Sequence, residues 1–212
     1  MRVGVDEAGK GPVLGSMFAA AIRAPPDAIP AGVDDSKTLT PARREELAAA
    51  LRSDDRVTVG VAEIPTERID DPETDMNTLT VAAQAEALGG VVAAGDDCLL
   101  DAGDTDADRF GRRVADRVDA RLELTAEHGA DESDPLVGAA SIVAKVARDG
   151  HVESLADSYG EVGSGYPSDP TTREFLADYV ERHGDLPDCA RSSWSTSDDV
   201  LAAAEQSTLG EF

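Results

Sequence analysis

The sequence of 212 residues predicts an α/β fold, with a central sheet flanked by helices and a helical C-terminal extension. Residues 56–64 (RVTVGVAEI) alternate with period two, which is typical of a half-buried strand. Residues 97–100 form a short, largely apolar run that ends at Asp101. Predicted strands precede Asp131 and predicted helices follow it, so a sheet with a helical extension is the simplest architecture.

The N-terminal region predicts two strands joined as a wide hairpin. Residues 2–5 are mostly apolar and run directly into Asp6, so we expect the first strand to end there. Residues 7–15 contain three glycines and a proline, which favour a turn-rich connection. Residues 16–24 (SMFAAAIRA) are then expected as the second strand.

The middle of the chain predicts two helices. The first covers 41–51, with Thr40 as its N-cap and a proline at its first position. The second is alanine-rich and covers 78–88, and residues 91–94 are expected to extend it.

The C-terminal half is predicted to be mainly helical. The expected elements are a helix at 107–117, a strand at 121–125 and helices at 135–158, 170–183 and 197–205. Asp134 and Asp169 are the expected N-caps of the helices that follow them. We expect a catalytic core at 1–158 and a helical extension at 159–212 packed on it, forming a single compact domain.

Composition indicates a strongly acidic protein. Acidic residues number 43 against 19 lysines and arginines, which gives a formal net charge of −24. Such acidity ordinarily argues against a nucleic-acid partner, because phosphate binding needs positive charge. A different interpretation is adaptation to a salt-rich cytoplasm, since the Debye length falls to about 3 Å at 1 M salt. We therefore expect a halophilic protein that loses its fold at low salt.

Cysteine usage and hydropathy indicate a soluble, cytoplasmic protein, which we expect to be a monomer. Cys98 and Cys189 are too few for a disulfide framework. No apolar run approaches the roughly 20 residues that span a bilayer. Acidic residues at positions 6 and 7 leave no apolar region for a signal peptide.

Asp6, Glu7 and Asp101 are the strongest candidates for chemistry, because each follows a buried-strand sequence. Carboxylates that meet at the ends of neighbouring strands raise one another's pKa, and Mg²⁺ or Mn²⁺ relieves that repulsion. The alternative is that these acids only cap turns. A further candidate lies downstream, but the pattern does not decide among Asp131, Glu132 and Asp134.

Two short motifs could contact a phosphate. Gly9, Lys10 and Gly11 form a glycine-rich turn whose amides could approach a ligand closely, although a plain hairpin would need the same glycines. Ser36 and Lys37 combine a hydroxyl and an ammonium group, although a surface turn explains them equally well.

Three later residues are weaker candidates. Lys145 and Arg148 could contact a substrate or could pair with the many acids. Tyr166 lies in a glycine-rich loop, where an aromatic ring can stack on a sugar or base or can simply pack. The three histidines show no ligand spacing and are interpreted as structural.

Taken together, the motifs resemble ribonuclease HII, the type 2 ribonuclease H family, in its archaeal form. The matching stretches are GVDEAGKGPVLG, DDSKTLTPARRE, LLDAGDTDADRF, ADESDPLVGAASIVAKVARD and EVGSGYPSDPTTREFL, and they follow the family's order over most of the chain. The resemblance implies an RNase H-like fold with a mixed five-stranded sheet. It also implies metal-dependent endonucleolytic cleavage of RNA in RNA–DNA hybrids and at ribonucleotides embedded in duplex DNA, giving 3′-hydroxyl and 5′-phosphate ends.

The resemblance assigns roles residue by residue. The family's metal-binding and catalytic carboxylates, which hold two Mg²⁺ or Mn²⁺ ions, fall on Asp6, Glu7, Asp101 and Asp131. Its junction-reading turn falls on Gly9, Lys10 and Gly11, its loop tyrosine on Tyr166, and its phosphate-contacting loop on Ser36 and Lys37.

The main departure from the family is Lys10, because this turn usually reads Gly-Arg-Gly. A bidentate arginine contact to phosphate would be lost, whereas backbone contacts from the glycines should remain. Two other functions remain as alternatives, a phospho-acceptor receiver domain and a non-catalytic hybrid-binding protein. The terminal STLGEF segment could also dock on a sliding clamp, or could be a frayed end.

Overall fold

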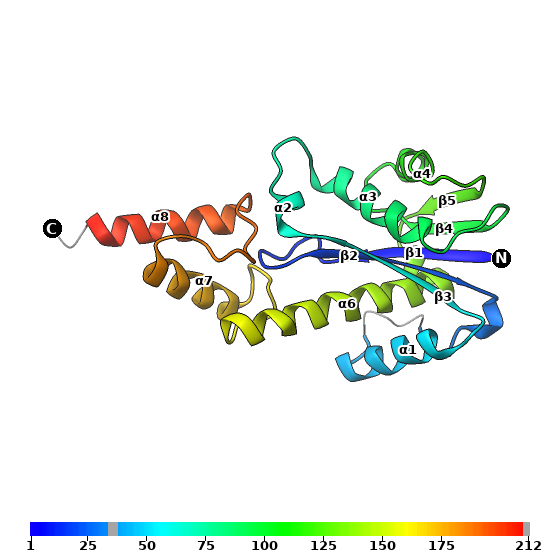
Figure 1. Ribbon diagram of the computed structural model, residues 1–212, viewed down its shortest axis with the longest axis horizontal. Helices are drawn as coiled ribbons and strands as arrows, with labels where there is room; N and C mark the ends of the chain where they lie inside the picture. The colour runs from blue at the N-terminus through cyan, green and yellow to red at the C-terminus, as the bar shows by residue number, and fades with distance from the viewer. Residues whose placement is uncertain (34–37, 210–212) are drawn as a thin grey trace. The chain divides into compact units, whose positions relative to one another are not determined.

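The computed structural model describes residues 1–33 and 38–209. Figure 1 shows its strands and helices in chain order. The strands are β1 (Arg2–Ala8), β2 (Met17–Ala24), β3 (Thr58–Ile64), β4 (Asp97–Asp101) and β5 (Glu123–Glu127). The helices are η1 (Pro26–Ala28), α1 (Pro41–Ser53), α2 (Thr66–Ile69), α3 (Met76–Gly89), α4 (Ala107–Ala115), α5 (Ala130–Ser133), α6 (Pro135–Tyr159), α7 (Pro170–His183) and α8 (Ser195–Leu209).

The chain divides into two compact units. The first unit holds the sheet and comprises residues 1–10, 17–63 and 75–148. The second unit comprises residues 11–16, 64–74 and 149–212. The second unit therefore joins the C-terminal region to two short segments from much earlier in the chain.

The five strands form one mixed sheet in the order β3-β2-β1-β4-β5. β1 is antiparallel to β2 and parallel to β4, and β4 is parallel to β5, which confirms the predicted α/β fold with a mixed sheet. Pairing of β1 with β4 ends at Val5 and Leu100, whereas pairing with β2 continues to Ala8. The prediction that the first strand ends at Asp6 is therefore wrong, because pairing with β2 extends it by two residues to Ala8.

A glycine in β1 lets α6 pack directly on the sheet. A Cβ atom at Gly4 would lie 2.2 Å from the main-chain carbon of Leu136 and 2.3 Å from the nitrogen of Val137. Only a residue without a side chain can occupy this position. α6 contributes Ile142 and Val143 to a core cluster that also contains residues of α1 and β2.

The three predicted N-caps are confirmed. Thr40 Oγ1 accepts a hydrogen bond from the backbone N–H of Arg43 at 3.3 Å. Asp134 Oδ1 accepts one from Leu136 N–H at 2.9 Å, and Asp169 Oδ1 accepts one from Thr171 N–H at 3.0 Å. Each cap satisfies a donor that the first helical turn leaves without a partner.

One predicted helix boundary is wrong, and two short helices were not predicted. α3 ends at Gly89, so the predicted extension through 91–94 is wrong. The consecutive glycines at 89 and 90 explain this, since each costs a helix about 1 kcal/mol relative to alanine. The short helices α2 and α5, with four residues each, were not predicted, because one turn is too short to show periodicity.

Cys98 and Cys189 are both buried and free. Within residues 1–33 and 38–209, no helix combines the length and the apolar character needed to cross a membrane.

Candidate active site

Asp6 is buried at the point where β1 loses its pairing with β4, and its side chain is 5% exposed. Burial raises the pKa of Asp6 well above its ordinary value, and the nearby charges of Glu7 and Asp101 raise it further. Two donors oppose this effect: the backbone N–H of Glu7, 2.7 Å from Oδ1, and the hydroxyl of Ser141 on α6. Two hydrogen bonds thus hold the Asp6 carboxylate in place, but they do not offset the cost of its negative charge.

Glu7 lies between a hydrogen-bond donor and an ion-pair partner. Gln84 Nε2 donates to Glu7 Oε2 at 2.6 Å, and Lys10 Nζ lies 3.8 Å from Glu7 Oε1. Burial nevertheless raises the pKa of Glu7 to about 7, against the opposing effects of the Lys10 ammonium and the Gln84 amide. Asp101 adds a smaller repulsion.

Gln84 links the two acidic strands and was not predicted from the sequence. Its side chain, on α3, is fully buried, and Nε2 also donates to the main-chain oxygen of Asp101 at 2.9 Å. Its Oε1 atom has no hydrogen-bond partner among the described residues. A polar residue within the apolar, alanine-rich face of a helix is the sequence signal that could have indicated it.

Asp101 and Asp131 are connected through the start of α5. The N–H of Ala130 donates to Asp101 Oδ1 at 2.8 Å, and Asp131 follows with 4% of its surface exposed. Glu132 is exposed. Asp134 caps α6 and accepts a hydrogen bond from Arg2 Nη2 at 2.6 Å. Of these three acids, only Asp131 is both buried and not engaged in capping the helix.

Lys10 borders a cavity of about 390 Å³ beside Glu7. Lys10 Nζ donates to the main-chain oxygen of Gly103 at 2.6 Å, and Asp104 and His128 also line the cavity. A Cβ atom at Gly103 would lie 3.0 Å from Glu7 Oε1, so this glycine leaves room for the carboxylate. His128 was interpreted as structural, because its spacing in the sequence did not indicate a place at this cavity.

Lys145 reaches the carboxylates through one intervening hydroxyl. Its Nζ donates to Ser141 Oγ at 2.7 Å, and Ser141 in turn is hydrogen-bonded to Asp6. Ser141 was expected only as one of several small residues that allow close packing. Arg148, one turn further along α6, is partly buried.

Gly11 and Tyr166 belong to the second unit, where they lie against each other. A Cβ atom at Gly11 would lie 3.6 Å from Tyr166 Cε1. The loop around Tyr166 is anchored by the N–H of Val13, which donates to the oxygen of Gly165 at 2.8 Å. The other two predicted contacts, Ser36 and Lys37, lie outside the described residues.

The donor set suits a hard divalent cation, because Asp6, Glu7, Asp101 and Asp131 offer only carboxylate oxygens. Burial and repulsion raise the pKa of Asp6 and Glu7. A bound cation would stabilise the charged form of both carboxylates against these two effects. Within residues 1–33 and 38–209, no three His, Cys, Asp or Glu side chains converge closely enough to hold a metal as they stand. Cation binding would therefore require the carboxylates to move closer together than they stand here.

Comparison with known proteins gives a family match over most of the chain. The family model for ribonuclease HII matches residues 3–197. A ribonuclease HII from the halophilic archaeon Haloarcula marismortui is 70% identical over 212 residues, which cover 100% of both chains.

Two solved structures share the fold. The crystal structure of the ribonuclease H2 from Pyrococcus horikoshii OT3 has a TM-score of 0.88 and 36% identity, covering 97% of this chain and 99% of that one. A structure of the PCNA:RNase HII complex from Archaeoglobus fulgidus has a TM-score of 0.82 and 36% identity, covering 94% and 96%. The chain described here therefore belongs to the ribonuclease HII family, and it is a ribonuclease H with the RNase H-like α/β fold.

Proposed function

We propose that this enzyme cuts the RNA strand of RNA–DNA hybrids endonucleolytically, and also cuts at ribonucleotides embedded in duplex DNA. The products would carry 3′-hydroxyl and 5′-phosphate ends. One observation carries the proposal: buried Asp6 and half-buried Glu7 and Asp101 form a mutually repelling carboxylate group in a chain of this family. A receiver domain is disfavoured by the family match, and a non-catalytic binding protein would gain nothing from these charges.

The four carboxylates Asp6, Glu7, Asp101 and Asp131 would hold two divalent cations, Mg²⁺ or Mn²⁺. Such ions, when bound, supply a nucleophilic hydroxide near neutral pH and stabilise the negative charge that develops on the leaving oxygen. Asp6 is the best candidate for a ligand shared by both ions, because both Glu7 and Asp101 act on it electrostatically.

The surrounding residues orient these ligands. Ser141 and the N–H of Glu7 hold the Asp6 carboxylate, and Lys145 in turn donates to Ser141. Gln84 fixes one oxygen of Glu7 and leaves the other on the side of Lys10 and the cavity. Groups that orient metal ligands in this way commonly contribute ten- to hundred-fold to metal affinity.

Substrate recognition would use two groups of residues. Gly9, Lys10, Gly11 and Tyr166 would read the 2′-hydroxyl at the RNA–DNA junction, since this hydroxyl is what distinguishes RNA from DNA. Gly9 has a φ of 94°, so its backbone conformation favours glycine. Ser36, Lys37, Lys145 and Arg148 would contact phosphates or the strand that is cut.

The test is cleavage of a duplex that carries one ribonucleotide, in high KCl, with and without Mg²⁺ or Mn²⁺. We expect a single metal-dependent cut, and we expect Asp101→Asn to abolish it without changing the far-UV circular dichroism. Asp97→Asn is the matched control, because Asp97 lies at the other end of β4 with its side chain 64% exposed. Undiminished cleavage by Asp101→Asn or by Asp6→Asn would refute the assignment.

We further propose that a sliding clamp contacts the terminal STLGEF segment and that the enzyme acts as a cytoplasmic monomer. Support for the clamp comes from the Archaeoglobus relative, whose structure is of a complex with PCNA. Residues 210–212 of the segment lie outside the described part of the chain. Removing residues 207–212 should abolish clamp binding in a pull-down and leave cleavage of short duplexes unchanged; equal clamp binding by the truncated chain would contradict this.

A further inference from the structure

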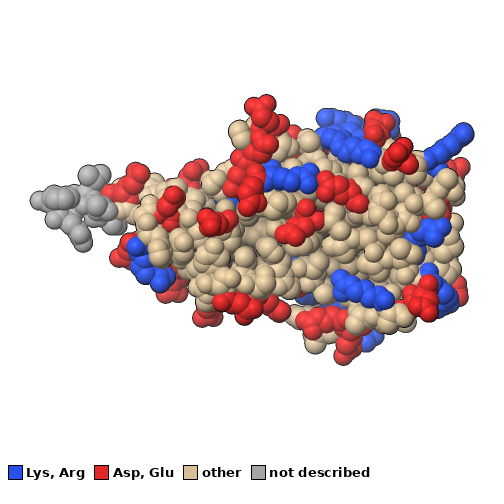
Figure 2. Space-filling view, viewed as in Figure 1, with Lys and Arg blue, Asp and Glu red and all other residues tan. Residues whose placement is uncertain are grey.

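Arginines are concentrated on α4 and the residues around it. Residues 104–121 contain five arginines and five aspartates and are therefore neutral, in a chain whose formal net charge is −24. The arginines are Arg109, Arg112, Arg113, Arg117 and Arg121. Figure 2 shows blue side chains gathered over α4, at the upper right.

Three of these arginines follow one another at intervals of four residues. Arg109 and Arg113 lie one above the other on the same side of α4. Arg117 follows in the turn after the helix ends at Ala115, where its N–H donates to the main-chain oxygen of Val114 at 3.0 Å. We call these three arginines the arginine face. Arg109 lies in the first turn of α4, where the helix dipole disfavours a cation, and it is four residues from the like charge of Arg113. Helix stability therefore does not account for Arg109.

Arg113 and Arg117 are anchored to the protein, and Arg109 is not. Arg113 Nη2 donates to Thr78 Oγ1 at 2.8 Å, and its Nη1 lies 4.0 Å from Asp104 Oδ2. Arg117 Nη1 donates to the main-chain oxygen of Arg113 at 3.3 Å. The exposed side chain of Arg109 makes no hydrogen bond or ion pair with any of the residues 1–33 and 38–209, although acids outnumber bases in the chain.

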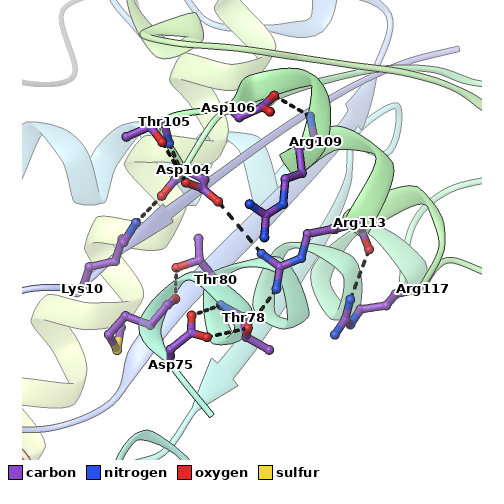
Figure 3. Close-up of polar contacts among 12 residues, drawn as sticks. Lys10, Asp75, Thr78, Thr80, Asp104, Thr105, Asp106, Arg109, Arg113 and Arg117 are labelled. Carbon is purple, nitrogen blue, oxygen red and sulfur yellow. Dashed lines mark hydrogen bonds and ion pairs between the residues drawn. The ribbon is translucent and has the colours of Figure 1, made fainter.

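The arginine face begins beside the candidate active site. Asp104, the partner of Arg113, lines the same cavity as Glu7 and Lys10. In Figure 3, the side chains of Arg109 and Arg113 extend from α4 toward Asp104, with Lys10 on the far side of it. Cationic groups therefore extend from the catalytic carboxylates onto the surface of α4.

We propose that the arginine face binds the sugar–phosphate backbone of the substrate duplex where it leaves the active site, with Arg109 as the main contact. The partner follows from charge complementarity, because a row of guanidinium groups matches regularly spaced phosphates and can bind each in a bidentate manner. The identity of the duplex rests on the proposed function.

The experiment compares Arg109→Gln with Arg112→Gln. Arg112 is also an exposed arginine of α4, and its side chain makes no hydrogen bond or ion pair with the described residues, but it lines a different cavity with Leu122 and Leu124. Both changes are made in the Asp6→Asn background, so that no cleavage occurs. The dissociation constant of a fluorescent RNA–DNA hybrid is measured by anisotropy across a series of KCl concentrations at which circular dichroism shows the fold intact.

Arg109→Gln should weaken binding several-fold at the lowest salt and reduce the slope of log affinity against log salt by about 0.9, the value for one lost phosphate contact. Arg112→Gln should leave both quantities unchanged. An unaltered slope in Arg109→Gln, or an equal loss in Arg112→Gln, would overturn the proposal. Failure of the wild-type enzyme to cut the duplex would instead refute the proposed function, and the binding series would still decide the role of the arginine face.

Discussion

At the scale of single residues, Gln84 makes the sharpest prediction. Replacing it with leucine removes the donor to Glu7 and the donor to the main-chain oxygen of Asp101. We expect Gln84→Leu to require at least about tenfold more Mg²⁺ for half-maximal cleavage, because Glu7 loses the group that orients it. The measurement is the cleavage rate across a Mg²⁺ titration.

Thr80→Val is the control for the Gln84 variant. Thr80 is also fully buried on α3, but its hydroxyl donates to the main-chain oxygen of Met76 at 2.7 Å. This variant should lose stability without a change in its Mg²⁺ requirement. An unchanged requirement in Gln84→Leu as well would exclude the orienting role.

The raised pKa of Glu7 predicts how stability depends on pH when metal is absent. Its folded-state pKa of about 7 lies above the ordinary value of 4.5, so the unfolded chain ionises first as pH rises. The wild-type fold therefore loses stability between about pH 4.5 and 7, by about 3 kcal/mol for such a shift. Glu7→Gln removes this loss.

Thermal melts in high KCl with a metal chelator test the effect. Glu7→Gln should melt above the wild type at pH 8 and together with it near pH 4, where the wild-type carboxyl is neutral in both states. A wild-type advantage at pH 8 would show that Glu7 stabilises the metal-free fold, contrary to this account.

The residues that could be predicted are those that follow a strand pattern. Asp6, Glu7 and Asp101 come directly after apolar runs, so their location depends only on local sequence. Gln84 and Ser141 reach the same carboxylates from helices, and only tertiary packing brings them there. Whether their roles match the family's remains a prediction until the variants are measured.

At the scale of elements, the contact between β1 and α6 depends on Gly4. Alanine at this position would place a Cβ atom 2.2 Å from the main chain of Leu136, where real Cβ atoms are not found. We expect Gly4→Ala to destabilise the fold by about 1–3 kcal/mol or more, since α6 must move away. That movement would also separate Ser141 from Asp6 and lower the rate of cleavage.

Gly89→Ala is the matched control for Gly4→Ala. Gly89 is the last residue of α3, and a Cβ atom there would meet nothing within 4 Å. Alanine is the better helix former, so this variant should be neutral or gain up to about 1 kcal/mol. Denaturant unfolding of both variants measures the difference, and equal stabilities would show that α6 adapts to the added methyl group.

Elements were predictable where a local signal defines them. The caps at Thr40, Asp134 and Asp169 act within one turn of their helices, and all three are confirmed. The end of β1 was not predictable, because it depends on how far β2 continues alongside it. A strand boundary is set by the partner strand, which the residues of the strand itself do not reveal.

At the scale of the whole molecule, the second unit depends on contacts between distant segments. The buried guanidinium of Arg191 donates to the main-chain oxygen of Gly15 at 2.9 Å. The Asp70 carboxylate accepts hydrogen bonds from the backbone N–H groups of Ser192 and Ser193, at 2.7 and 3.0 Å. These partners are more than 100 residues apart, so local patterns in the sequence do not indicate them.

The balance of 43 acidic residues against 19 basic ones predicts that the stability of this fold depends on salt. At about 0.1 M salt the Debye length is roughly 10 Å, and surface carboxylates at that distance repel one another. At about 1 M it falls to roughly 3 Å, and the repulsion is screened.

We therefore expect the far-UV melting temperature to fall steadily as KCl is lowered from about 3 M to about 0.1 M. Sucrose at low KCl separates the causes, because it favours burial without screening charge. A sharp melt that is unchanged across the KCl series would show that repulsion among these carboxylates does not limit stability, and rescue by sucrose alone would assign the salt effect to burial.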